Sequence, residues 1–185
     1  MCLAMNQLYE MYEKMISSIE KKKDFSFMAP MHTILAGCKA LWCDIGLEGV
    51  KTMRECCGAA GFSKYSGIHH CFNQGSPLVT LEGDSVVMNL QTARALLKNG
   101  RQVVVKNKKQ QKWLQYIEEL TVIMQDAESV FCKATEDDVE YFNNLDNLDS
   151  LLKWNALYSI GNCLKLFADP KYKEYNNWEK FYQTF

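Results

Sequence analysis

The amino-acid sequence predicts an all-α protein built as a helical bundle. Hydrophobic residues recur every three to four positions in several long segments, which is the period of an amphipathic helix. Only the short run Val103-Val104-Val105 has the composition of a strand. The chain has 185 residues, of which 48% are hydrophobic and 23% charged, as in globular proteins of one domain with a substantial core. These observations together favour packed helices over sheets or disorder.

Two long helices are expected in the first part of the chain. Residues 2–20 carry an apolar stripe, and the charged run at 21–24 is expected to end this helix in solvent. The stripe consists of Ala4, Leu8, Met11, Met15 and Ile19. Residues 31–57 are apolar on more than one side, which is typical of a helix in the middle of a bundle. Its glycines, Gly37, Gly46 and Gly49, predict close packing against another element, since glycine otherwise weakens a helix.

The middle of the chain combines a glycine-rich segment with a further helix. Residues 58–83 are predicted to be a long irregular loop, a kind of segment that often carries function. A helical pattern resumes over residues 84–98, and Asp84 and Ser85 stand where a helix N-cap belongs. Residues 101–112 are polar and basic. A solvated connector is the favoured interpretation of that segment, and a basic binding groove is the alternative.

Two more helical regions are expected between residues 113 and 185. The first has a narrow apolar seam, formed by Trp113, Ile117, Leu120, Met124, Ala127 and Phe131. The second covers about 138–167 with a break near Asn143-Asn144, and Pro170 lies just beyond its end. Its stripe is Leu148, Leu152, Ala156, Ile160, Leu164 and Phe167. The aromatic tail, residues 171–185, is expected to dock on the body.

Composition and motifs exclude several classes of function. A formal net charge of −1 gives no bulk attraction to nucleic acid or to an anionic membrane. The N-terminus lacks the pattern of a secretory signal, and no stretch is apolar enough to predict a membrane span. The eight cysteines mostly lie in apolar helical patterns, which favours buried thiols in a reducing compartment over a disulfide framework. His69-His70-Cys71 and Cys56-Cys57 match no standard zinc spacing, so no metal site is predicted.

Two charged residues lie in or beside the helix at 84–98. Glu82 is the only acidic residue of an apolar run just before this helix. It is either a carboxylate that interacts with the helix dipole or a catalytic base. Arg94 has apolar neighbours along the helix, which favours a buried ion pair within the protein over contact with a ligand.

Three blocks of the sequence resemble a known enzyme family. They are "MHTILAGCKALWCDIGLEGVKTMRECCG", "CGAAGFSKYSGI" and "LVTLEGDSVVMNLQTARALLK". They are similar to a helix, to a C-G-G-H-G-Y…S-G-I turn and to a T-[FY]-E-G-[DE]-N-T-V-M-x-L-Q-T-A-R segment of the acyl-CoA oxidases, flavoenzyme relatives of the acyl-CoA dehydrogenases. The resemblance is strong over residues 29–98, fits the helix upstream and is loose beyond 100. It implies an oxidase-like helical domain at 1–100, the connector at 101–112 and a C-terminal helical segment at 113–185.

The resemblance implies a reaction and a site. The fold would be the C-terminal α-domain of that family, which oxidises fatty acyl-CoA to trans-2-enoyl-CoA and yields hydrogen peroxide. Glu82 would be the catalytic base, and Gly83 would allow the backbone to approach the substrate. The turn bounded by Gly58 and Gly61, together with Asp84, would contact FAD across a dimer interface. No metal is implied.

Two hypotheses of different classes remain open at this point. In the first, the chain supplies Glu82 and half of a flavin site to an acyl-CoA oxidase and is completed by the family's N-terminal helical and β-domains. In the second, it is a truncated, non-catalytic paralogue that binds a full-length oxidase or another partner through its helices. The intact L-E-G-D turn favours the first. Ala59 and Ala60, where the family has glycine and histidine, favour the second.

The resemblance also bears on partners and compartment. Fatty acyl-CoA would be the substrate, and the chain would form a homodimer or associate with a full-length oxidase. The family points to peroxisomes, although the final residues Gln183-Thr184-Phe185 are not an S-K-L-type signal, which leaves the cytoplasm as the alternative.

Overall fold

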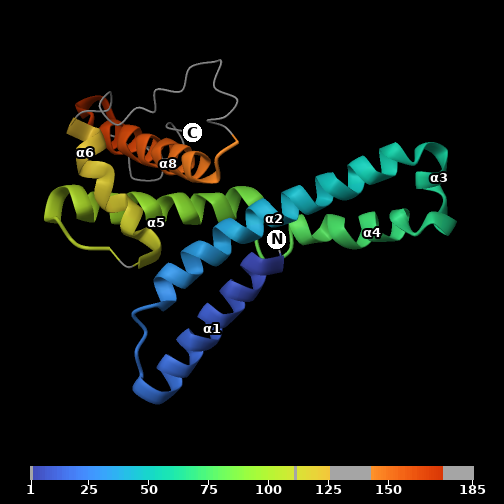
Figure 1. The fold of residues 1–185 in the computed structure, drawn as a ribbon, viewed down its shortest axis with the longest axis horizontal. Helices are drawn as coiled ribbons and strands as arrows, with labels where there is room; N and C mark the ends of the chain where they lie inside the picture. The colour runs from blue at the N-terminus through green and yellow to red at the C-terminus, as the bar shows by residue number, and fades with distance from the viewer. Residues whose placement is uncertain (1, 111, 126–142, 173–185) are drawn as a thin grey trace. The chain divides into compact units, whose positions relative to one another are not determined.

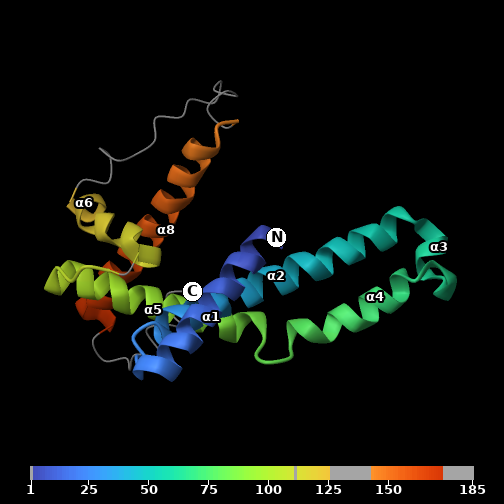
Figure 2. The same cartoon turned by 60° about the horizontal axis from the view of Figure 1, so that its bottom comes forward.

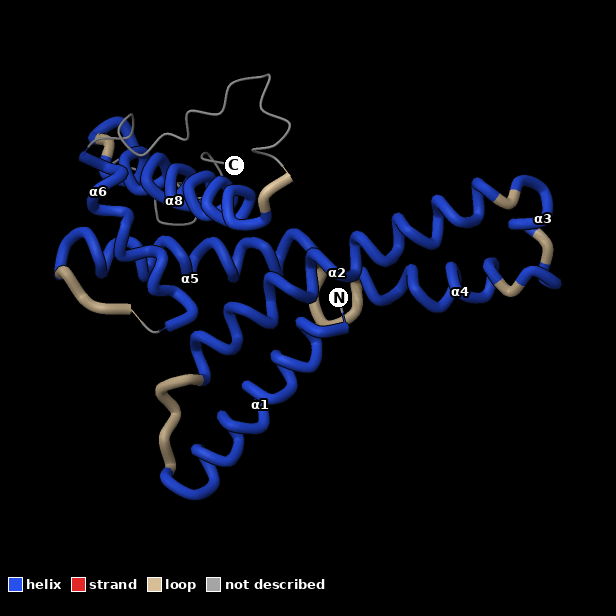
Figure 3. Tube along the Cα trace, in the orientation of Figure 1, coloured by secondary structure: helices blue, strands red, loops and turns tan. Residues whose placement is uncertain are grey.

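Helices make up most of the residues that the structure describes, which are 2–110, 112–125 and 143–172 of a computed structural model. No strand occurs in these ranges, so the predicted all-α class is confirmed (Figures 1 and 3). The chain divides into two compact units, Met1–Arg94 and Ala95–Phe185, and the division falls inside helix α5 (Ser85–Lys106). None of the described helices is sufficiently long and hydrophobic to span a membrane.

The first unit begins with two long helices that pack through methionines. Helix α1 (Cys2–Lys22) ends within the charged run, as predicted, and α2 (Met28–Cys56) follows after a short turn. Met11 and Met15 of α1 are buried with Met31 of α2. Leu8 and Ile19, from the predicted stripe, pack against this cluster. The stripe therefore faces the second helix, which confirms the apolar period of α1.

Residues 58–79 are not the irregular loop that their glycines suggest. They form α3 (Gly58–Phe62), the 3-10 turn η1 (Lys64–Ser66), α4 (Ile68–Gly75) and the 3-10 turn η2 (Ser76–Val79). The prediction was wrong because the glycine and proline residues stand at the ends of short helices. Gly67 adopts a left-handed conformation before α4, and Pro77 lies in the first turn of η2, where a proline is well tolerated. Only residues 80–84 remain as a turn before α5.

Helix α5 starts in the first unit and crosses the early part of α2. The Thr92 hydroxyl donates a hydrogen bond to the Thr33 carbonyl at 3.3 Å. His32 Nε2 lies 2.8 Å from Gln91 Oε1. A Cβ at Gly37 would touch Thr92, so this glycine permits close packing as predicted. Among the described residues, positions 46 and 49 have open space beside them, and there the prediction of close packing was wrong.

Helix α5 extends eight residues beyond the predicted end at residue 98. The basic connector expected at 101–112 is therefore helical as far as Lys106, and Val103 within it is buried. The prediction was wrong because the polar residues of this segment occupy the solvent side of a helix whose other side carries Val103 and the buried Gly100.

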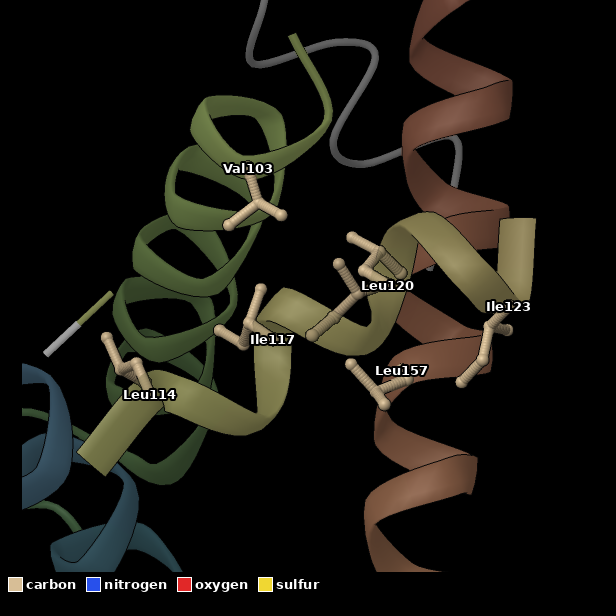
Figure 4. Close-up of a cluster of buried hydrophobic side chains, with 7 residues drawn as sticks. Val103, Leu114, Ile117, Leu120, Ile123 and Leu157 are labelled. Carbon is tan, nitrogen blue, oxygen red and sulfur yellow. The ribbon is translucent and has the colours of Figure 1, made fainter. Parts of the chain in front are cut away.

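The second unit has its own hydrophobic core. It is built from the end of α5, the 3-10 segment η3 (Lys112–Glu119), α6 (Leu120–Gln125) and α8 (Leu145–Ala168). Six of the buried side chains converge between these elements in Figure 4: Val103, Leu114, Ile117, Leu120, Ile123 and Leu157. Ile160 of α8 belongs to the same cluster. Ile117 and Leu120 belong to the predicted seam, which confirms that part of the pattern. Trp113 is exposed, because η3 has the tighter 3-10 period.

Helix α8 begins where its sequence predicts and turns part of its predicted stripe to the core, since Ile160 is buried and Leu164 packs against the core cluster. The Asn144 side chain accepts a hydrogen bond from the Asp146 amide and caps the helix, at the predicted break. Leu152 of the predicted stripe is exposed, whereas Leu157 is buried. The prediction chose the wrong member among the many leucines of this helix. Predictions for Ala127, Phe131, residues 138–142 and the tail from 173 onward lie outside the described residues.

Candidate functional site

Glu82 lies in the short turn between η2 and α5, in the first unit. Its backbone has φ +58°, and the following Gly83 has φ +103°. A positive φ is uncommon for a residue with a Cβ, since the side chain crowds the backbone there. The turn therefore holds Glu82 in a conformation that its residue type disfavours. The side chain is exposed.

Asp84, two residues after Glu82, caps helix α5. Its carboxylate accepts a hydrogen bond from the Val87 amide at 2.8 Å. This is the geometry of an N-cap, and it confirms the capping role predicted for this position. The cap is thus supplied by Asp84, and the carboxylate of Glu82 is left for another role.

Gly83 is favoured chiefly by its own φ, and the flexible end of the Met88 side chain also occupies the space where a Cβ would stand. A Cβ at this position would overlap the methyl group of Met88, one turn into α5. The glycine therefore lets the turn fold back closely over the start of the helix.

Two side chains of helix α2 form hydrogen bonds with the turn and with the first residue of α5. The Lys39 ammonium donates hydrogen bonds to the Val79 carbonyl at 3.0 Å and to the Gly83 carbonyl. Five residues further along α2, the Asp44 carboxylate accepts a hydrogen bond from the Ser85 hydroxyl at 2.7 Å. Sequence reasoning assigned no role to Lys39 or Asp44. The available signal was two charged residues inside a largely apolar helix, where a charge needs a partner.

The apolar setting expected around Glu82 is not formed by the described residues. Leu78, Leu81 and Val86 flank the turn, and all three are exposed along with it. A carboxylate becomes a stronger base when water is excluded from it. In this chain the residues that could exclude water lie on an open surface.

The predicted glycine turn begins helix α3. Gly58 has φ +52°, is exposed, and has open space where a side chain would stand. Ala59 and Ala60 are exposed beside it. Gly61 differs, because it is buried and a Cβ there would overlap the backbone carbonyl of Arg54. Gly61 therefore lets α3 pack closely on the end of α2.

Arg54 links the elements around this turn. Its guanidinium lies over the ring of Phe62 at 4.9 Å from the centroid and over that of Phe72 at 5.0 Å. Its Nε is buried and has no hydrogen-bond partner among the described residues. The stacked arginine joins α2, α3 and α4 at one end of the first unit.

The structure separates the two parts of the predicted site. Gly58 and Gly61 lie at one end of α4, and the turn with Glu82, Gly83 and Asp84 lies beyond its other end (Figures 1 and 2). The eight residues of α4 alone span about 12 Å. One unit therefore cannot close both parts around a single small group.

The remaining candidate residues form no common site. Arg94 is exposed, so the burial predicted for its side chain was wrong. His69 lies 2.9 Å from the Asn73 side-chain amide, one turn along α4. Cys56, Cys57 and Cys71 are exposed free thiols. Within the described ranges, no three histidine, cysteine or carboxylate side chains gather as metal ligands would.

Comparison with known proteins gives the chain a family. The family model described as "Acyl-CoA oxidase, C-alpha1 domain" matches residues 1–97. Peroxisomal acyl-coenzyme A oxidase 2 of Mus musculus is 37% identical over 84 residues, which are 45% of this chain and 12% of that protein. Peroxisomal acyl-coenzyme A oxidase 1 of Homo sapiens is 38% identical over 80 residues, 43% of this chain and 12% of that protein.

Solved structures extend the similarity to nearly the whole chain. The structure of acyl-CoA oxidase 1 from Arabidopsis thaliana matches with a TM-score of 0.76 and 25% identity. That of LeACX1, an acyl-CoA oxidase from tomato, matches with a TM-score of 0.81 and 25% identity. Each match covers 96% of this chain and 25% of the solved chain.

The chain thus spans about an eighth of the curated relatives and a quarter of the solved oxidases. Two findings agree with each other: the family model covers more than half of the chain, and the fold is that of the matched part of the plant enzymes. The chain belongs to the acyl-CoA oxidase family, as its C-terminal helical part.

Proposed function

We propose that this chain supplies the catalytic base and part of the flavin site of an FAD-dependent acyl-CoA oxidase of fatty-acid β-oxidation. The observation that carries the proposal is the turn at Glu82. Its glutamate is exposed, is held at a positive φ and stands in a turn that Lys39 and Asp44 tie to α2. The backbone that carries this carboxylate is held in place, and the exposed side chain is open to a group that approaches from outside the unit.

Glu82 would remove a proton from the carbon next to the thioester carbonyl of a fatty acyl-CoA. The proton moves to the Glu82 carboxylate, and the bonding electrons become part of the new double bond as a hydride leaves the neighbouring carbon. Bound FAD would supply the acceptor for that hydride, and molecular oxygen would then take the electrons as hydrogen peroxide. The organic product is a trans-2-enoyl-CoA.

The residues present fit a cofactor at Gly58 better than at Gly61. Gly58 is exposed with open space above it, so its backbone could contact the flavin dinucleotide. Gly61 is occupied by its packing on Arg54 and would support the turn from beneath. Asp84 is engaged as the cap of α5, and any contact with the cofactor would add to that role.

The separation of the Gly58 turn from the Glu82 turn agrees with an active site that is formed by two subunits. If Gly58 reaches a cofactor of one subunit and Glu82 serves another, a dimer or an association with a further oxidase polypeptide is needed. Peroxisomes would be the compartment by resemblance to the curated relatives. The exposed Leu78, Leu81 and Val86 would be covered in such an assembly, which would exclude water from Glu82.

A second candidate function is that of a non-catalytic paralogue acting as a helical interaction module. Ala59 and Ala60 favour it, because they replace the glycine and histidine of the family turn. The outer part of α2 favours it too, since Leu41, Ile45 and Met53 are all more than half exposed. Such a module would bind a partner through this surface without contributing to the reaction.

A complementation experiment distinguishes the two functions. The full chain is produced together with an acyl-CoA oxidase from which the matched quarter has been deleted, and the complex is purified. We expect a flavin spectrum and peroxide formation that depends on palmitoyl-CoA. The Glu82→Gln variant should lose the peroxide and keep the flavin, whereas Glu55→Gln, an exposed glutamate of α2, should keep both.

Two outcomes would reject the enzymatic function. One is a yellow complex that makes no peroxide with the unaltered chain. The other is full activity of the Glu82→Gln complex. The first outcome would leave the interaction module as the function of the chain.

A further inference from the structure

We infer that Lys39 is a positioning residue for the Glu82 base. The inference rests on the function proposed above. It starts from the place of Lys39 on α2, where the side chain is half-buried and reaches across to the backbone that brackets Glu82.

The two carbonyls bound by Lys39 mark the limits of the turn. Val79 is the last residue of η2, and Gly83 directly follows Glu82. One ammonium group therefore ties together the points where the chain leaves η2 and where it approaches α5. Hydrogen bonds from a charged donor are stronger than those between neutral groups, and partial burial strengthens them further.

The turn needs hydrogen bonds from another element, because its own backbone conformation is strained at Glu82. Two successive residues, Glu82 and Gly83, have positive φ, and only glycine adopts this conformation without strain. The hydrogen bonds on the η2 side, from the Thr80 and Leu81 amides to the Pro77 carbonyl, end before Glu82. The contact of Lys39 with the Gly83 carbonyl fixes the peptide that joins Gly83 to Asp84, one residue beyond Glu82.

Asp44 provides a second tie on the α5 side. Its hydrogen bond to Ser85 secures the residue that starts α5, and the Asp84 cap fixes the first turn of that helix. Lys39 is distinct from these contacts, because it binds the Gly83 carbonyl within the turn, whereas the other two act at the start of α5. Loss of Lys39 should free the turn and leave the helix start in place.

The first measurement uses the full chain alone and needs no activity. Backbone order parameters of Glu82 and Gly83 are obtained by NMR relaxation for the unaltered chain and for Lys39→Met. We expect values near the rigid limit of about 0.85 in the unaltered chain and below about 0.6 in the variant. Lys51→Met is the matched control, since Lys51 lies on the same helix and binds only the exposed Glu48 among the described hydrogen bonds.

The second measurement uses the complex with the deleted oxidase. A base held in the wrong place slows the chemical step, while binding of the acyl-CoA is unaffected. We expect Lys39→Met to lower kcat on the order of tenfold to a hundredfold with KM changed less than about threefold. Lys51→Met should leave both constants unchanged. A merely structural defect would lower the amount of folded complex instead of splitting kcat from KM.

Lys39→Gln is a second variant in case Lys39→Met does not fold. Its shorter, neutral side chain cannot reach both carbonyls, so the same two changes are expected. Unchanged order parameters at Glu82 and Gly83 in a folded variant would overturn the inference, whatever the activity. An active complex with undiminished kcat in either variant would overturn it as well. A third outcome is possible: the complex with the unaltered chain is inactive, but the order parameters of the turn fall in the variants. That outcome would reject the proposed function and still establish that Lys39 holds the turn.

Discussion

Gly61 lies so close to Arg54 that a single methyl group at Gly61 would overlap the Arg54 backbone carbonyl. The opposing group is backbone, which cannot rotate away as a side chain could. The contact joins α3 to the end of α2 and brings Phe62 beneath the Arg54 guanidinium. A glycine that the family resemblance assigns to a cofactor therefore has a structural role within the unit.

Gly61→Ala should destabilise the chain by about 1–3 kcal/mol, because the backbone must shift to admit the Cβ. Gly49→Ala is the matched control on α2. It has open space among the described residues and should stabilise the helix by about 0.5–1 kcal/mol. Urea unfolding followed by circular dichroism measures both. Equal stability of the two variants would contradict the packing described for Gly61.

Leu157→Ala should destabilise the second unit by about 2–5 kcal/mol, because it leaves a cavity beside Ile117 and Leu120. Leu157 is 1% exposed. Leu152→Ala, on the same helix at 70% exposure, should change stability by less than about 0.5 kcal/mol. The same unfolding experiment compares them. A larger loss at Leu152 would contradict the exposure of that side chain and the burial of Leu157.

The described cysteines should differ in reactivity with a thiol reagent. Burial raises the pKa of the Cys38 and Cys163 thiols above the usual value, so less thiolate is present at neutral pH. Cys56, Cys57 and Cys71 are exposed and should be alkylated first. As the pH is raised, the labelling rates of Cys38 and Cys163 should be the last to increase, because their thiolates form at higher pH. Peptide mass spectrometry over time measures each rate, and early labelling of Cys38 would contradict its burial.

Glu82→Gly should raise the free energy of unfolding by about 1 kcal/mol or more, since the strain at φ +58° is relieved. The same change removes the proposed base and should abolish peroxide formation in the complex. Glu55→Gly, inside the last turn of α2, is the control and should instead lower stability by about 1 kcal/mol. A loss of stability in Glu82→Gly would show that its side chain makes contacts that outweigh the strain.

Much of the fold could be predicted where one face of a helix is apolar and the other is not. The stripe of α1 and the helix boundary near Asn143-Asn144 are local patterns, and α8 does begin directly after Asn144. The spacing of hydrophobic residues was less informative in α8, which is apolar on several sides. The prediction therefore placed Leu152 in the core and missed Leu157. The segment 58–79 was misjudged because glycine and proline also stand at the ends of short helices.

Only part of the candidate site could be predicted from the sequence. The L-E-G-D motif marks the turn, but the partners that hold it are far away along the chain. Lys39 precedes Gly83 by 44 residues, and Asp44 precedes Ser85 by 41. Such pairs depend on how α2 and the turn meet in space, which no local pattern encodes. The separation of Gly58 from Glu82 by α4 likewise emerged only with the tertiary structure.

The left-handed backbone of Glu82 has a consequence for the choice of residue in the turn. At this position the residue that suits the backbone and the residue that suits the chemistry are different. Glycine and asparagine both adopt positive φ more easily. If the carboxylate is the proposed base, the chemistry asks for a residue that the backbone at φ +58° disfavours, and the turn depends on Lys39 and Asp44 of α2 to hold it.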